Sequence, residues 1–189
     1  DLYTEDTLVA HVIAPWYLHV MLRRLTTSFQ HKDLSAILKN SAEIGHYLSD
    51  IHVPLHTSSN HNGQLTNQRG IHAFWESRVP ELLCDQSFDF FIGKASYLTN
   101  TDEFIWSVVM ESAKSVDSVL AMESALTSEW SDKSKYAFEN RNGHLVKQYS
   151  SGFTKLYNSR LNGMVERRMR QAVWGVASFW FTAWVNAGQ

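Results

Sequence analysis

The sequence is poor in cysteine, in proline and in net charge, and each shortage excludes a class of protein. One cysteine in 189 residues rules out an intramolecular disulfide framework and a cysteine-rich zinc ribbon. A formal net charge of −2 leaves no broad electrostatic footprint for duplex DNA or for an anionic membrane. Histidine, by contrast, is frequent: the sequence has nine histidines against one cysteine. Any metal site would therefore use imidazole and carboxylate ligands.

Long apolar runs are also lacking. The longest run, residues 173–185, is interrupted by Gly175, Ser178 and Thr182. It is shorter than the roughly 20 residues that a bilayer crossing needs, so we interpret it as part of a buried helix. The composition is otherwise that of a globular protein, with 44% hydrophobic and 19% charged residues.

Apolar residues recur at helical spacing through most of the chain. Pro15 is typical of a first helical turn, and Asp33 is a candidate cap for a second helix. The apolar stripe of that second helix comprises Leu34, Ile37, Leu38, Ile44, Gly45 and Leu48.

A third helix is expected after Thr101 and Asp102, which can cap it. A long helical pattern then covers residues 145–186, and the pair Asn162–Gly163 is expected to kink or split it. With three prolines, no repeat and no linker, residues 1–189 are predicted to form a single domain.

Two regions lack this periodicity. Residues 57–70 form a long polar loop, and loops of this length are often functional. Residues 128–143 are expected to be an excursion or a few short helical turns. Because we see no alternating strand pattern, the predicted fold class is all-α, a multi-helix bundle.

The candidate metal ligands lie between residues 46 and 76. His46 and Asp50 are four positions apart, which places both on one face of a helix. His56 follows after Pro54, and His72 with Glu76 forms a second such pair beyond the polar loop. His56, His72 and Glu76 would make a three-ligand zinc site, while His46 and Asp50 would supply two ligands of another. Asp50 could bridge two cations.

The alternative is that these polar residues form a solvated helix face, which we would favour for one isolated pair. Two pairs and a further histidine favour a metal site instead. The remaining histidines that we considered are expected to be surface or core residues rather than ligands: His11, His19, His31, His61 and His144.

The strings GHYLSDIHVPLH, NHNGQ and GIHAFWE resemble the zinc-dependent phospholipase C and single-strand-specific nuclease superfamily. The family pattern begins with His, three residues, Asp, five residues and His, and this part matches from His46 to His56. After a variable loop it continues with His, three residues and an acid, and this part matches from His72 to Glu76. Pro15–Trp16 and the C-terminal run also resemble bacterial members, so the likeness covers most of the chain.

This resemblance implies a phosphodiester hydrolase with up to three Zn²⁺ ions and a secreted or periplasmic location. His46 and Asp50 resemble ligands of a first zinc, with Asp50 also reaching a third metal. His56, His72 and Glu76 resemble the complete protein ligand set of the second zinc. Glu76, where fungal nucleases tend to have Asp, is similar to the phospholipase variant.

The chain departs from the family at its beginning. Family members bind zinc through their mature N-terminal residue and early histidines, and an early Asp is the proposed general base. Residues 1–14 contain a single histidine, His11, and do not match this early part of the family pattern. We therefore assign no catalytic residue. We expect this chain to be the C-terminal part of a longer protein, with one complete zinc site and weak or no activity of its own.

Three functions stay open: a phospholipase C, a nuclease of the same chemistry, and a catalytically silent helical fragment that retains a metal. A nuclease would need aromatic surfaces for unpaired bases. The candidates are Tyr47, Phe74, Trp75 and Trp106, each equally suited to a core. Three arginines could contact phosphate or form an exposed helix face: Arg167, Arg168 and Arg170. The sequence leaves the oligomeric state open.

Overall fold

The computed structural model describes residues 14–189, so His11 and the expected absence of ligands before Pro15 lie outside the described residues. The structure is 69% helix and 7% strand, which confirms a mainly helical fold. Its residues form two compact units. Residues up to 59, 91–114 and 168–189 make unit 1, and residues 60–90 and 115–167 make unit 2. Helices α6 (Thr101–Glu129) and α9 (Met164–Asn186) contribute to both units.

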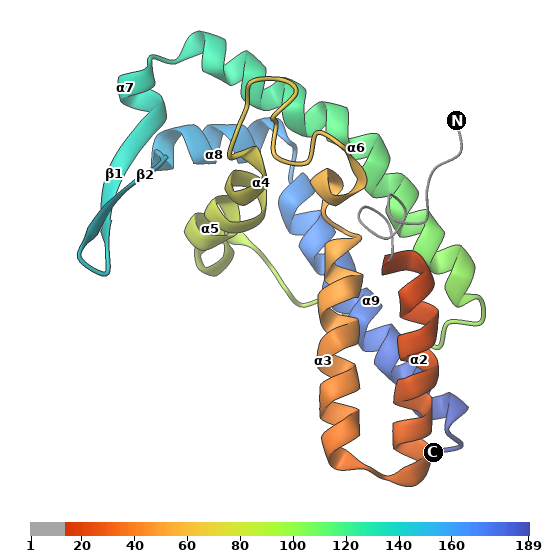
Figure 1. The fold of residues 1–189 in the computed structure, drawn as a ribbon. Helices are drawn as coiled ribbons and strands as arrows, with labels where there is room; N and C mark the ends of the chain where they lie inside the picture. Colours follow the sequence, from red (N-terminus) through yellow and green to blue (C-terminus); the bar gives the residue numbers. More distant parts are fainter. Residues whose placement is uncertain (1–13) are drawn as a thin grey trace. The chain divides into compact units, whose positions relative to one another are not determined.

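Unit 1 contains an antiparallel pair of helices, α2 (Ala14–His31) and α3 (Leu34–Asp50), which lie side by side (Figure 1). As predicted, Pro15 lies in the first turn of α2. The Asp33 carboxylate caps α3 by accepting a hydrogen bond of 3.0 Å from the backbone N–H of Ala36. At the start of a helix the first N–H groups have no partner within the helix. Pro15 has no N–H group, and Asp33 accepts a hydrogen bond from one of them, so both residues favour a helix start.

The core of unit 1 joins α2 and α3 to parts of α6 and α9. It comprises Leu18, Met21, Leu22, Leu25, Ile44, Leu48, Ile51, Ile105, Val108, Phe179 and Ala183. The predicted stripe of α3 is wrong at its beginning, where Leu34 and Leu38 are 75% and 73% exposed. These two residues lie in the first two turns of α3, and the core cluster does not include them.

Helix α6 begins one residue earlier than its predicted caps suggest. The Asn100 side chain accepts a 3.1 Å hydrogen bond from the backbone N–H of Glu103. Asn100, rather than Thr101 or Asp102, is therefore the capping residue, and Asp102 instead contacts the His19 imidazole at 3.2 Å.

In unit 2, α4 (Ile71–Ala73), the π-helix η2 (Phe74–Arg78) and α5 (Val79–Ser87) follow one another without a break. Gly70 and Pro80 in the sequence predict a short helix bounded by these two residues. The boundary at Pro80 is wrong, because α5 continues through it. Proline has no N–H to give to the carbonyl four residues earlier, and a π-turn precedes it, in which the N–H of Val79 bonds the carbonyl of Phe74. The wider turn lets the helix continue through Pro80.

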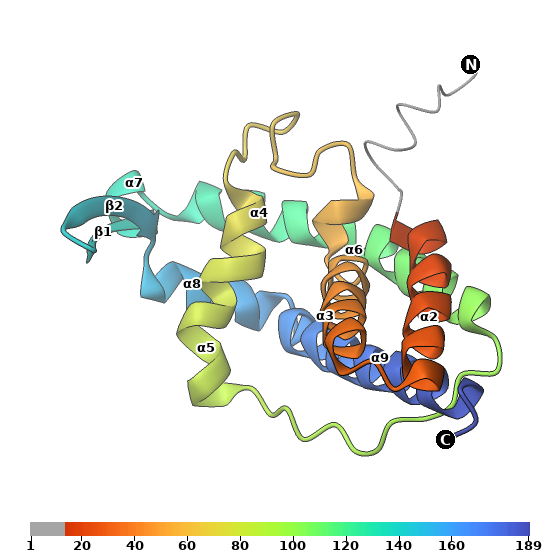
Figure 2. The ribbon, with the colours of Figure 1, turned by 60° about the horizontal axis from the view of Figure 1, so that its bottom comes forward.

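A two-stranded antiparallel hairpin follows the short helix α7 (Asp132–Lys135) in unit 2: β1 (Tyr136–Arg141) and β2 (His144–Tyr149) (Figure 2). The expectations of no strands and of a helix from Leu145 are therefore wrong. Asn142 and Gly143 adopt φ values of 53° and 84°, as a two-residue hairpin turn with a matching twist requires. The Asn-Gly pair was the sequence signal for this hairpin.

The predicted break at Asn162–Gly163 is confirmed. Helix α8 (Ser151–Arg160) ends just before it, and α9 begins at Met164. Asn162 and Gly163 have φ values of 51° and 71°, which an α-helix cannot continue through. Among the described residues, α9 included, no helix is long and apolar enough to span a membrane.

Candidate metal centre

Three of the predicted ligands lie together in unit 1. His46 and Asp50 share one face of α3, where Nε2 of His46 is 3.5 Å from Oδ2 of Asp50. His56 lies on the 3₁₀ helix η1 (Pro54–Thr57), with its Nδ1 3.9 Å from the same Asp50 oxygen. His46 is 68% exposed, whereas Asp50 and His56 are each 28% exposed. One carboxylate oxygen of Asp50 thus lies close to two imidazoles.

The link between α3 and η1 is held by buried groups of unit 1. The guanidinium Nε of Arg168 donates a 2.9 Å hydrogen bond to the His52 carbonyl. The Ser112 hydroxyl donates to the Ile51 carbonyl, and Arg168 also donates to Ser112. Because these contacts fix residues 51 and 52, they set the position of His56 relative to Asp50.

Arg168 therefore has a different role from the one its sequence suggested. It is 1% exposed and forms an ion pair of 2.7 Å with Glu111. Both interpretations from the sequence, a phosphate contact and a residue of an exposed helix face, are therefore wrong for Arg168. A guanidinium buried in this way needs its donors satisfied, and Glu111, Ser112 and the carbonyls of His52 and Val108 accept them.

His52, which sequence reasoning did not consider, is a core residue. Burial lowers the pKa of its imidazole to about 4, so the ring is neutral at pH 7. Its Nδ1 lies 2.7 Å from the Leu48 carbonyl, which requires this nitrogen to carry the proton.

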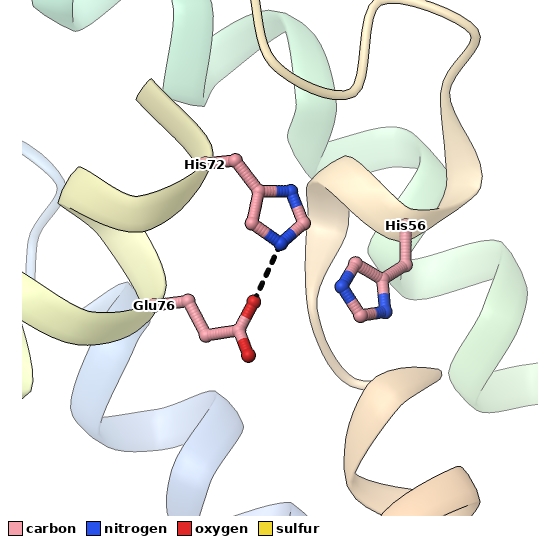
Figure 3. Close-up of side chains that lie close together, drawn as sticks. All are labelled: His56, His72 and Glu76. Atoms are coloured by element: carbon pink, nitrogen blue, oxygen red, sulfur yellow. Dashed lines mark ion pairs between the residues drawn. The ribbon is translucent and has the colours of Figure 1, made fainter. Parts of the chain in front are cut away.

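The other two predicted ligands, His72 and Glu76, pair within unit 2. Nε2 of His72 lies 2.7 Å from Oε2 of Glu76, the ion pair drawn with a dashed line in Figure 3. His72 lies on α4 and Glu76 on the π-helix η2. The separation of four residues places them on one helical face, as their spacing indicated.

The ring of His72 is oriented by the polar loop. Its Nδ1 lies 3.2 Å from the backbone carbonyl of His61, and a carbonyl only accepts, so Nδ1 carries the proton. Metal-bound histidines make the same kind of contact through the nitrogen that does not bind the ion. Nε2, the nitrogen that contacts Glu76, is therefore the one that would bind a metal. Sequence reasoning assigned His61 no role, because its contribution comes from its backbone.

The loop that holds His61 is tightly built. The Asn60 side chain accepts a 2.7 Å hydrogen bond from the N–H of Leu65, and the Asn62 side chain accepts one of 3.0 Å from the N–H of Gly70. Gly63 has a φ of 70°, and a Cβ there would overlap the backbone carbonyl of Gln68. The asparagines and Gly63 explain why this sequence has no apolar period and still adopts a defined shape.

A buried polar cluster anchors the loop to α6. The Gln68 amide donates to the Leu120 carbonyl at 2.8 Å and to Glu123 at 2.6 Å. Glu123 also accepts from Lys135 at 2.7 Å and from the Tyr149 hydroxyl at 3.2 Å. Burial alone would raise the pKa of Glu123, but the hydrogen bonds from Lys135 and Gln68 lower it overall. The carboxylate is therefore charged at neutral pH and holds the loop in place.

Two aromatic residues proposed for base stacking are unsuited to it. Phe74 is 1% exposed and Trp75 is 2% exposed, and Phe74 stacks on Tyr149 with ring centroids 3.8 Å apart. Tyr47 and Trp106 are partly exposed. Of these four candidates, Tyr47 and Trp106 are the two that could offer a ring face to a ligand.

Comparisons of the chain with protein-family models, with curated proteins and with solved structures found no match. The likeness to the phospholipase C and nuclease superfamily therefore rests on the spaced residues themselves. The geometry adds that His46, Asp50 and His56 gather in one unit and that His72 pairs with Glu76 in the other.

Proposed function

We propose that this protein is a zinc-dependent phosphodiester hydrolase that resembles phospholipase C, with His56, His72 and Glu76 as the ligands of one zinc ion. The observation that supports this most is the His72–Glu76 pair, whose imidazole is oriented by the His61 carbonyl. A solvated helix face would not require such a contact. An oriented metal ligand does.

The chemistry of the donor set fits zinc. His56, His72 and Glu76 offer two imidazole nitrogens and one carboxylate oxygen as ligands. A catalytic zinc commonly has three protein ligands of these types and one position for water. Zinc held there would lower the pKa of a bound water to about 7 and would stabilise charge on a phosphoryl oxygen.

The residues of the chain would position these groups. The His61 carbonyl holds the proton of His72 on Nδ1, and the π-helix η2 places the carboxylate of Glu76 one turn from that ring. Asp50, with one oxygen near both His46 and His56, would orient His56 and supply a ligand of a further zinc. His46 and Asp50 are the two ligands that we propose for that further zinc.

The experiment is a hydrolysis assay on zinc-loaded protein and on a His72→Ala variant. His144→Ala is the matched control, because His144 is an exposed histidine of β2 with no assigned ligand role. We expect weak phosphodiesterase activity that disappears in His72→Ala and persists in the control. Activity that survives His72→Ala would contradict the proposal. Zinc binding without any activity would instead support the catalytically silent helical fragment.

A single-strand-specific nuclease is the second candidate. Trp16 is 53% exposed and meets Trp106 edge-to-face, with ring centroids 5.3 Å apart, and an exposed indole can stack on an unpaired base. Parallel assays on phosphatidylcholine and on single-stranded DNA separate the two substrates. We expect preference for the phospholipid, because Glu76 resembles the phospholipase variant. The secreted or periplasmic location is proposed from the same resemblance.

A further inference from the structure

Unit 2 contains a pocket of about 340 Å³ that no metal ligand lines. The end of the polar loop contributes Arg69 and Gly70 to its wall, α4 and η2 contribute Ala73 and Phe74, and the hairpin contributes Tyr136 and Lys147. The volume lies in the range of roughly 300–1,000 Å³ that small-molecule sites occupy. The pocket is therefore large enough for a small organic ligand.

The charge of this pocket has one sign. Its lining residues include the cations Arg69 and Lys147 and no carboxylate. Among the described residues, neither cation forms an ion pair, and the side chains of both are exposed. Two cations that share a pocket repel each other unless an anion lies between them.

The hairpin register keeps acidic side chains away from Lys147. Phe138 pairs with Lys147 and Tyr136 with Tyr149, so Lys147 and Tyr136 lie on the same face of the hairpin. Glu139 pairs with Val146 and lies on the other face.

The carboxylate of Glu139 is already neutralised. It forms ion pairs with Arg78 and Arg141, and Arg78 and Arg141 also bind Glu81. The one acidic residue of the hairpin, Glu139, is therefore engaged on the face opposite Lys147, and the charge of the pocket stays positive.

The Lys147 ammonium is held at the pocket wall. It lies 3.8 Å from the centroid of the Tyr136 ring, a cation–π contact that restrains the side chain without neutralising it. A restrained cation binds an anion with a smaller loss of side-chain entropy than a freely moving one.

We propose that this pocket binds the phosphate group of a phosphodiester, with Arg69 and Lys147 as its cationic contacts. The choice of a phosphodiester rests on the proposed function. Arg69 supplies a planar fork that matches two phosphate oxygens, and Lys147 supplies a point charge. The elements that hold His72 and Glu76, α4 and η2, also contribute Ala73 and Phe74 to the pocket.

The test is phosphodiester binding to the full chain after removal of metal by a chelator, measured by isothermal titration calorimetry. The probes are glycerophosphocholine for a lipid head group and thymidylyl-thymidine for a nucleic acid, with choline and thymidine as phosphate-free controls. We expect saturable binding of the phosphodiesters alone, weakened by about three- to tenfold in Arg69→Gln and in Lys147→Gln. Preference between the two probes identifies the source of the phosphate.

Lys155→Gln is the matched control, since Lys155 is an exposed cation of α8 outside the pocket. The Lys155→Gln variant should bind the phosphodiesters with the same affinity as the unmodified chain. Equal weakening by all three substitutions, or the absence of saturable binding, would overturn the proposal. This titration uses metal-free protein, so its result does not depend on the hydrolysis assay. A failed hydrolysis assay would contradict the proposed function but not phosphate binding in the pocket. Hydrolysis without saturable binding to the metal-free protein would contradict the pocket but not the proposed function.

Discussion

At the scale of single residues, the account depends on two side chains that share one helical face. The spacing of His72 and Glu76 predicted their proximity, and their atoms lie 2.7 Å apart. The sequence could not predict that the His61 carbonyl orients His72. That contact uses a backbone atom, whose position depends on how the whole loop of residues 57–70 folds.

The carboxylate of Glu76 is expected to contribute to zinc affinity. In Glu76→Gln an amide oxygen replaces a charged ligand, so the zinc dissociation constant should rise by at least about tenfold. Competition with a zinc-binding dye measures this change. Asp117→Asn, which removes an exposed carboxylate from α6, is the control and should bind zinc normally. An unchanged affinity in Glu76→Gln would exclude Glu76 as a ligand.

Glu123 should make stability depend on pH. Its pKa is lowered in the folded protein from the ordinary value of 4.5. The stability that it contributes is therefore fully present above pH 4.5 and is lost as the pH falls through the folded-state pKa. Urea unfolding between pH 7 and pH 3.5 should give a shallower loss of unfolding free energy in Glu123→Gln than in the unmodified chain. Parallel pH profiles would show that the Lys135–Glu123 pair does not titrate in this way.

At the scale of elements, capping residues and turn pairs predicted the helix ends better than apolar stripes predicted burial. Asp33 and Asn162–Gly163 mark their boundaries because they act within a few residues of the chain. Leu34 and Leu38 follow the helical period and remain exposed, since burial depends on which helices arrive later. The pair Asn142–Gly143 is a local signal for a hairpin turn, but the helical spacing of the apolar residues from Leu145 onward predicted a helix there instead.

The polar loop should tolerate substitution at Gly63 poorly. Gly63→Ala places a Cβ against the Gln68 carbonyl at a positive φ, whereas Gly143→Ala has the positive φ alone, with open space around it. We expect Gly143→Ala to cost about 1 kcal/mol and Gly63→Ala to cost about 2 kcal/mol or more. Thermal unfolding of both variants measures the difference. Equal costs would mean that the loop does not need this close approach.

At the scale of the whole molecule, the predicted helical class holds, apart from the hairpin. The division into two units was not visible in the sequence, because α6 and α9 each run through both units without a break. Nor could the sequence indicate that Arg168 binds the backbone of residue 52. Contacts between residues more than a hundred positions apart are set by packing, which no local pattern reports.

Zinc should stabilise the folded chain. A ligand that binds only the folded state at a hundred times its dissociation constant adds about 2.7 kcal/mol. The thermal midpoint should therefore rise with zinc in the unmodified protein and in His144→Ala, and it should stay constant in His72→Ala. A rise of equal size in His72→Ala would assign the stabilising metal to other ligands.

The number of tightly bound zinc ions tests the central claim most directly. Zinc titration, monitored by competition and checked by elemental analysis, should find one tight equivalent for each chain. That equivalent should be lost in His56→Ala, in His72→Ala and in Glu76→Gln, and it should remain in His144→Ala. No tight equivalent in the unmodified chain, or one that survives all three substitutions, would contradict the account.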